Sequence, residues 1–312
     1  MDDLRRIADA VLYEGYVLWP YRRSATKNQR RWTFGGVYPR AHSEVHPDDR
    51  CTMRTQCLVE GERPAVDVRV RFLHVIERRV SHEGRYVDEL TLDGERYVAW
   101  DEATEREMAG PGPIEIPAGR SEEDVGGAAL VRSWKRLAGR IDVSTEQLAE
   151  DLHRVTVLVS NDTPVATGDR EAALRQTFCS THTILTVRGG AFVSLTDPPA
   201  ELRDEAARCL NEGTWPVLAG ARGERHTVLS SPIILPDHPE VAPESPGDLF
   251  DGGEIDQMLV LNILSMTDEE KREMRAADPR TRAILERTEA LTPEQVMSLH
   301  GTIREFRMAR PR

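Results

Sequence analysis

An alternating run at residues 66–75 constrains the fold more than any other part of the sequence. Apolar Val66, Val68, Val70 and Phe72 alternate there with charged Asp67, Arg69 and Arg71. Successive side chains of a strand point to opposite faces of a sheet, so this period of two predicts a strand with one buried face and one wet face. Such alternation is typical of antiparallel sheets.

Turn signals divide the following residues into further short strands. His82-Glu83-Gly84-Arg85 and Leu92-Asp93-Gly94-Glu95 precede extended segments at 86–90 and 97–100, and Asp-Gly is a favoured hairpin turn. We therefore expect a three-stranded antiparallel meander over 66–100. More strands are predicted at 155–159, 177–187, 191–195 and 226–235, with the second and third of these forming a hairpin.

Two other segments predict something other than strand. Residues 103–127 are rich in Gly, Pro and Glu, so we expect a loop there, and it is the candidate internal break of the chain. Ser144-Thr145-Glu146-Gln147 fits a capping box, which predicts a short helix running to about residue 153.

The C-terminal part carries helix-start signals in close succession. Thr267-Asp268-Glu269-Glu270 fits a capping box, Asp278-Pro279 places proline at a first helical position, and Thr292-Pro293-Glu294-Gln295 gives a further helix start. The sequence therefore predicts a helical unit over 254–312 after a β-rich domain over 1–253. The expected fold class is α+β, with a mainly antiparallel, sandwich- or barrel-like sheet core and a helical C-terminal unit.

Charge and composition disfavour several classes of function. The 312-residue chain has 41 Lys and Arg against 53 Asp and Glu, a net charge of −12, which disfavours binding to nucleic acid or to an anionic membrane. No apolar run is long enough to span a membrane, and four cysteines are too few for a disulfide framework. We expect a cytoplasmic protein without the common short catalytic or nucleotide-binding motifs.

A basic stretch interrupts this acidic chain between residues 21 and 38. It contains no acid, and its cations interleave with aromatic residues; the candidate binding residues are Arg22, Arg23, Lys27, Arg30, Arg31 and Trp32. Guanidinium groups bind phosphate or carboxylate, and aromatic rings offer stacking faces. The stretch is therefore either a docking patch for an acidic partner or phosphorylated ligand, or a solvated loop with aromatic anchors in the core.

An acidic stretch at residues 239–256 has the opposite character. Six carboxylates lie among prolines and glycines, and Glu244, Asp248 and Asp251 are its candidate binding residues. Such a loop could hold a hard cation, although EF-hand spacing is missing. Alternatively its last acids favour the start of the following helix and the others face water. A third reading docks the basic stretch on the acidic one, which contributes little stability if both are exposed.

Thiol and imidazole groups give the chain its candidate metal ligands. Cys179, His182, Cys209 and His226, with nearby acids, would suit zinc, iron or nickel. Residues 179 and 182 of a regular strand face opposite ways, so both could reach one ion only across a bulge. The alternatives are that the cysteines are buried packing residues, or that Cys179 is a nucleophile with an imidazole base, for which no orienting third group can be named.

Several longer segments carry a resemblance to a known family. They include 12–22, 27–35, Phe178-Cys179-Ser180-Thr181-His182-Thr183, 214–218, 229–235 and 243–252. Across nearly its whole length the chain resembles an uncharacterised bacterial family associated with gene clusters for actinobacterial-type uptake nickel–iron hydrogenases. The resemblance implies a role near hydrogenase assembly or function, with hydrogenase subunits or maturation factors as partners, and it carries over no catalytic residue.

Two hypotheses follow. The first is a non-catalytic accessory or assembly protein that binds other proteins, since opposite charge patches occur without a reaction motif. The alternative is a metal-binding protein or metal-dependent enzyme using Cys, His and Asp ligands. A nucleic-acid or nucleotide binder is the least favoured reading, because the net charge is −12.

Overall fold

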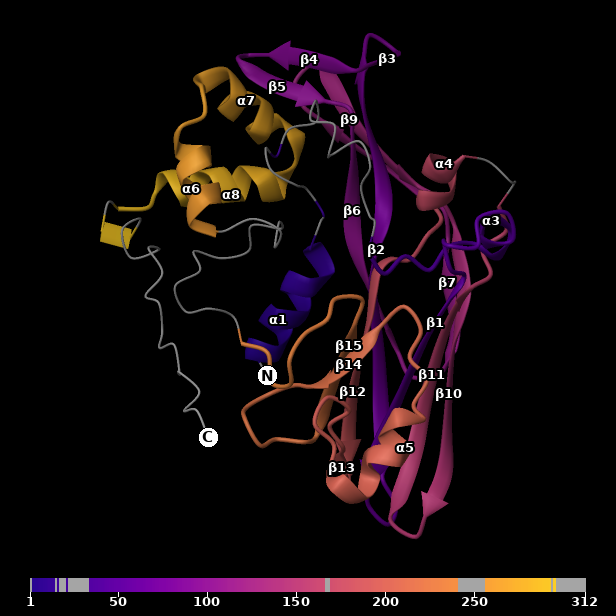
Figure 1. Cartoon of the computed structure of the whole chain (residues 1–312). Coiled ribbons are helices and arrows are strands. Elements are labelled where there is room, and N and C mark those ends of the chain that lie inside the picture. Colours follow the sequence, from indigo (N-terminus) through magenta and orange to yellow (C-terminus); the bar gives the residue numbers. More distant parts are fainter. Residues whose placement is uncertain are drawn as a thin grey trace.

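The computed structural model describes residues 2–14, 16, 21, 34–165, 169–240, 256–292 and 294–295. It confirms the predicted α+β class: mostly antiparallel β-sheet, with helices at the C-terminal end of the described chain (Figure 1). Strands from two sheets face each other, and the helices lie outside them.

The smaller sheet has five strands in the order β13-β1-β11-β10-β7. These are β13 (Ala191–Phe192), β1 (Thr52–Glu60), β11 (Leu152–Asn161), β10 (Leu137–Ala149) and β7 (Gly112–Ile116). Every pairing within it is antiparallel. β10 and β11 follow each other in sequence and form a hairpin, whereas β13, β1 and β7 pair with strands that are distant in sequence. The partners of these three strands could not be read from local patterns.

The larger sheet is built around β2 (Ala65–His82). Its main order is β14-β15-β12-β2-β9-β8, and β3 and β6 also pair with β2. The bounds are β14 (Trp215–Leu218), β15 (Thr227–Ser231), β12 (Cys179–Arg188), β9 (Ala128–Trp134), β8 (Gly119–Asp124), β3 (Arg85–Val87) and β6 (Trp100–Ala109). A separate hairpin joins β4 (Glu89–Leu92) to β5 (Glu95–Val98).

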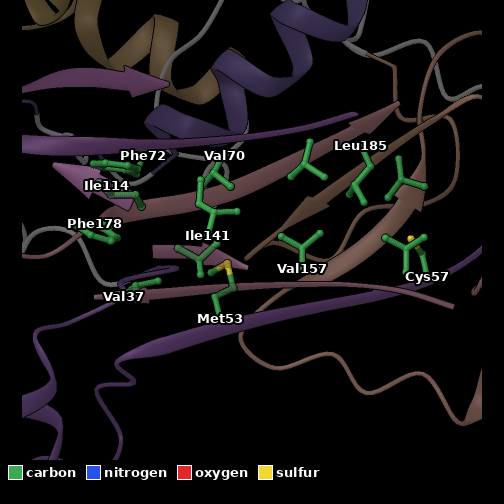
Figure 2. Packing of buried hydrophobic residues seen from close by; sticks show 14 of the residues in the cluster. Val37, Met53, Cys57, Val70, Phe72, Ile114, Ile141, Val157, Phe178 and Leu185 are labelled. Carbon is green, nitrogen blue, oxygen red and sulfur yellow. The ribbon is translucent and has the colours of Figure 1, made fainter. Parts of the chain in front are cut away.

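The alternation in β2 builds the core between the two sheets. Val68, Val70 and Phe72 are buried in a cluster with residues of the smaller sheet such as Ile141 and Val157 (Figure 2). The rings of Phe72 and Phe178 stack there with centroids 4.6 Å apart. The predicted buried face of this strand is confirmed.

The opposite face of β2 is wet only at its beginning. Asp67 and Arg69 are exposed, but Arg71 and Leu73 are buried because α1 (Asp2–Tyr13) and the C-terminal helices cover this part of the strand (Figure 1). The prediction of a fully wet face is wrong beyond Arg69, since an alternating pattern cannot show that a helix will cover its charged side.

The remaining helices are short in the middle of the chain and longer near its end. They are α3 (Arg40–Ser43), α4 (Arg170–Leu174), the 3₁₀ turn η1 (Ala200–Leu202), α5 (Arg203–Ala207), α6 (Asp256–Leu264), α7 (Asp268–Ala277) and α8 (Pro279–Glu289). Thr267 forms the predicted capping box of α7, and Asp278 caps α8 with Pro279 at its start. Ile263, Met274 and Leu285 pack these helices in one cluster with Leu73 of β2.

The prediction of a loop at 103–127, where the candidate internal break was expected, is wrong. Most of β6, all of β7 and all of β8 lie in this range, and β6 pairs with β2 from Arg69 to Arg78. Gly110 and Gly112 have positive φ angles of 70° and 151°, so these glycines mark the tight passage between β6 and β7. The frequent turn residues indicated a loop because they lie close together: β7 and β8, which they flank, have only five and six residues.

The helix predicted from Ser144 is also wrong. Ser144–Gln147 belong to β10, where Ser144 pairs with Thr156 and Thr145 with Val155 of β11. Ladder pairing with β11 replaced the local bonds that a capping box would supply. The prediction of a hairpin from 177–187 and 191–195 is wrong as well. β12 belongs to the larger sheet, whereas β13 pairs with β1 of the smaller sheet.

Candidate functional site

The candidate binding residues of the two charged stretches lie outside the described residues. This applies to Arg22, Arg23, Lys27, Arg30, Arg31 and Trp32 in the basic stretch and to Glu244, Asp248 and Asp251 in the acidic one. Their roles, and the docking of one stretch on the other, stay predictions.

Cys179 and His182 lie at the beginning of β12, on either side of an irregularity. Cys179 is opposite Leu73 of β2 and His182 is opposite Arg71, with a register shift between the two pairs. Ser180, inside the shift, has a φ angle of 52°. Because Leu73 and Arg71 are two residues apart, they share a face of β2. The bulge therefore turns Cys179 and His182 to the same face, which a regular strand would not.

The other two candidate ligands belong to different parts of the fold. Cys179 is buried in the cluster under the C-terminal helices, whereas Cys209 packs beside α5 in a cluster with Leu58 and Leu152. His226 is exposed, with Nδ1 3.2 Å from the carbonyl oxygen of Gly190. Within the described ranges, no three His, Cys, Asp or Glu side chains are arranged to hold a metal ion. The predicted set of four does not converge.

Burial controls the protonation of two interior imidazoles. His182 is fully buried, and its Nε2 atom has no hydrogen-bond partner. Burial, helped by the nearby Arg71 guanidinium, lowers the pKa of His182 to about 3. Burial and Arg106 similarly lower the pKa of His74 to about 4. Both rings are therefore neutral at physiological pH and are poor general bases where they lie.

These imidazoles predict acid sensitivity of the fold. The unfolded chain protonates each ring near pH 6.5, whereas the folded rings stay neutral down to about 4 and about 3. The unfolded state therefore binds more protons in this window, and stability falls as pH falls, by up to about 1.4 kcal/mol per pH unit for each ring. Urea unfolding across this range measures the slope.

The His182→Gln variant isolates one of the two rings. Its stability should fall less steeply with acidification than that of the unchanged chain, by about the contribution of one imidazole. The two curves should run parallel above about pH 7, where the ring is neutral in both states. Equal slopes in the acid range would contradict a buried neutral His182.

A dense set of polar contacts joins the C-terminal helices to the larger sheet. Arg78 of β2 donates from Nε to the carbonyl of Val98 at 3.1 Å and from Nη1 to Glu102 at 2.8 Å. Its Nη2 donates to the carbonyls of Ala276 and Ala277 at 3.1 and 2.6 Å. These two carbonyls end α7, where intrahelical donors are missing. One buried guanidinium thus holds a helix end on the sheet.

The sequence of β2 contains a signal for the role of Arg78. The even-numbered residues of β2 form its buried row, and His74 and Arg78 interrupt an otherwise apolar series that includes Ile76 and Val80. A charge in a buried row must be paired and hydrogen-bonded. That requirement predicts a partner for Arg78, although only the fold identifies Glu102 and α7.

Tyrosines of the N-terminal segment make a second junction with the C-terminal helices. Tyr16 donates its hydroxyl to Asp278 at 2.5 Å and accepts from the backbone N–H of Ala103 at 3.2 Å. Tyr13 donates to Glu105 at 2.8 Å, and the Arg280 guanidinium lies 4.0 Å from its ring centroid. The capping residue of α8 is therefore held by the N-terminal segment and, through it, by β6.

A cavity of about 280 Å³ lies between the β4–β5 hairpin, β9 and the helices α7 and α8. Its lining includes five arginines, and each pairs with a carboxylate of the chain: Arg78 with Glu102, Arg96 with Glu89, Arg132 with Glu123, Arg275 with Glu289 and Arg282 with Glu95. Because the guanidinium charges are balanced internally, the cavity does not offer the uncompensated positive charge that would select an anion.

A further cluster of ring side chains lies around α3. The Tyr38 ring stacks on His42, whose ring lies 4.4 Å from that of His46. His42 Nε2 is 2.9 Å from a carboxylate oxygen of Asp49, and Arg170 donates to the Tyr38 hydroxyl at 2.5 Å. Burial raises the pKa of Tyr38. The four-residue spacing of His42 and His46 was the available sequence signal for this cluster.

No family model matches the chain, and no curated protein matches it. None of the helices in the described ranges is both long enough and apolar enough to cross a membrane.

Proposed function

We propose that this chain is a non-catalytic accessory or assembly protein of the cytoplasm that binds other proteins, and that its partners are subunits or maturation factors of a nickel–iron hydrogenase. The binding role is supported by charge and by the position of the reactive groups. The hydrogenase partner is supported by the sequence resemblance of segments such as 178–183 and 229–235.

One observation carries the binding role: the side chains best suited to chemistry are interior packing residues. Cys179 and His182 are fully buried, and the Cys179 thiol contacts the carbonyl oxygens of Leu174 and Thr177 at 3.9 and 3.7 Å. A reacting group must reach its substrate within hydrogen-bond distance. Groups sealed under helices are poorly placed for that, so recognition by the surface accounts better for this arrangement.

Affinity purification of the tagged chain from its native host, followed by quantitative mass spectrometry, tests the proposal. Hydrogenase subunits or maturation factors should be enriched over an untagged control. Their absence from the purified material, while the bait is recovered intact, would overturn the hydrogenase role.

A pair of charge variants tests whether the basic stretch makes the contact. Replacing its five cations by glutamine, at Arg22, Arg23, Lys27, Arg30 and Arg31, should abolish the enrichment. The matched control removes the same amount of charge from exposed arginines elsewhere, at Arg120, Arg136, Arg188, Arg222 and Arg225, and should retain it. Equal losses in both variants would show a general charge effect and would contradict a specific docking patch.

A further inference from the structure

One edge of the smaller sheet lacks a partner strand. On one side, β10 pairs with β11 from Gly139 to Ala149. On its other side, β10 pairs with β7 only from Leu137 to Ile141. In the described ranges, no strand pairs with the other side of residues 142–147, here called the open edge. Apart from the half-buried Val143, its residues are exposed.

The direction of the backbone groups along the open edge follows from Ala138. Asp162 of the β11 side donates its N–H to the Ala138 carbonyl at 3.0 Å, and the Ala138 N–H donates to Thr163 at 2.9 Å. Residues alternate in the side toward which their backbone groups point. Even-numbered residues therefore face β11, and Val143, Thr145 and Gln147 present their N–H and C=O groups to the outside.

Other edges of the two sheets carry features that oppose pairing with another chain. β7 and β14 contain Pro113 and Pro216, and β8 ends in Glu122, Glu123 and Asp124. Proline, dense charge and short length are the common protections of an exposed edge. The open edge, Asp142-Val143-Ser144-Thr145-Glu146-Gln147, has no proline and no lysine and includes two β-branched residues. Its two carboxylates are each paired with an arginine of the same chain, Asp142 with Arg140 and Glu146 with Arg154.

We propose that the open edge pairs antiparallel with the open edge of a second copy of this chain, across a twofold axis at Thr145. In such a pair, residues whose backbone groups point outward must lie opposite each other, so odd-numbered residues pair with odd-numbered ones. The twofold axis must therefore pass through a residue and not between two residues. An axis at Val143 needs Ile141, which already pairs with Gly112 of β7, and an axis at Gln147 extends past the register shift after that residue. An axis at Glu146 opposes two glutamates, and one at Ser144 opposes Asp142 to Glu146. The axis at Thr145 opposes Thr145 to itself, Val143 to Gln147 and Ser144 to Glu146, with no like charges facing.

This self-complementary pattern favours a second copy over an unrelated extended segment. Pairing two copies joins the smaller sheets of both chains into one continuous sheet, and it satisfies the outward backbone groups of both strands at once. The long-range charge opposes it, because each chain carries a net charge of −12. Salt screens this repulsion, so the dimer should tighten as ionic strength rises, whereas the binding of a basic peptide would weaken.

Sedimentation velocity of the full chain over a range of concentrations tests the contact. The unchanged chain should show a monomer–dimer equilibrium that shifts toward dimer with salt. Thr145→Pro removes an outward N–H without breaking the ladder to β11, and it should weaken dimerisation at least tenfold. Thr145→Val keeps the N–H and the β-branched shape, and it should dimerise like the unchanged chain.

Two substitutions at Ser144 test the register itself. Ser144→Lys places a cation opposite Glu146 of the second copy twice per dimer, and should tighten dimerisation roughly 2- to 30-fold. Ser144→Glu should weaken it by a similar factor. A monomer at every concentration and salt level, or an unchanged equilibrium in Thr145→Pro and both Ser144 variants, would overturn the proposal. Dimerisation that weakens with salt would equally overturn it.

Discussion

Replacing Arg78 with alanine is expected to lower the free energy of unfolding by about 3–5 kcal/mol, the usual cost of removing one partner from a buried ion pair. The side chain is 6% exposed, and its loss leaves the carbonyls of Ala276 and Ala277 without this donor. The end of α7 then loses a link to the sheet. Equilibrium unfolding in urea measures the loss.

The neighbouring Arg79 provides the matched control for this substitution. Its side chain is 49% exposed and pairs with Glu77 on the surface, so Arg79→Ala should cost no more than about 1 kcal/mol. Limited proteolysis should release a C-terminal fragment sooner from the Arg78 variant than from the Arg79 variant. Similar stabilities of the two variants would contradict the role of Arg78 as the anchor of α7.

Replacing Phe178 with alanine is expected to cost about 3–5 kcal/mol, because the surrounding sandwich cannot close fully around the cavity. Phe178 is fully buried and stacks on Phe72. Its ring also lies against Gly139 of the opposite sheet, where an added Cβ would come within 2.8 Å of it. Thermal and urea unfolding of the variant measure this contribution.

The same substitution at Phe34 tests whether burial is the cause. The Phe34 side chain is 47% exposed, so Phe34→Ala should change the free energy of unfolding by much less than the interior substitution. A third variant, Phe178→Leu, should recover part of the loss because it refills some of the volume. Equal costs at the two phenylalanines would be inconsistent with a core centred on the Phe72–Phe178 stack.

The sequence predicted the structure best where the signal lies in adjacent residues. Thr267 caps α7 with the residues that directly follow it, and Asp278 and Pro279 begin α8 in the same way. The alternation in β2 likewise identified its buried face, because burial of one face follows from the period of the strand itself. The α+β class follows from these two kinds of pattern.

Only the tertiary structure decided which pattern prevails where signals conflict and where distant residues meet. Ser144–Gln147 look like a helix start, yet β11 makes them a strand with an open edge. The bulge at Ser180 turns Cys179 and His182 to one face, and Arg78 meets the end of α7 across 198 residues. These outcomes depend on ladder bonds and buried charges between different segments of the chain, and a local pattern does not identify which segment will be the partner.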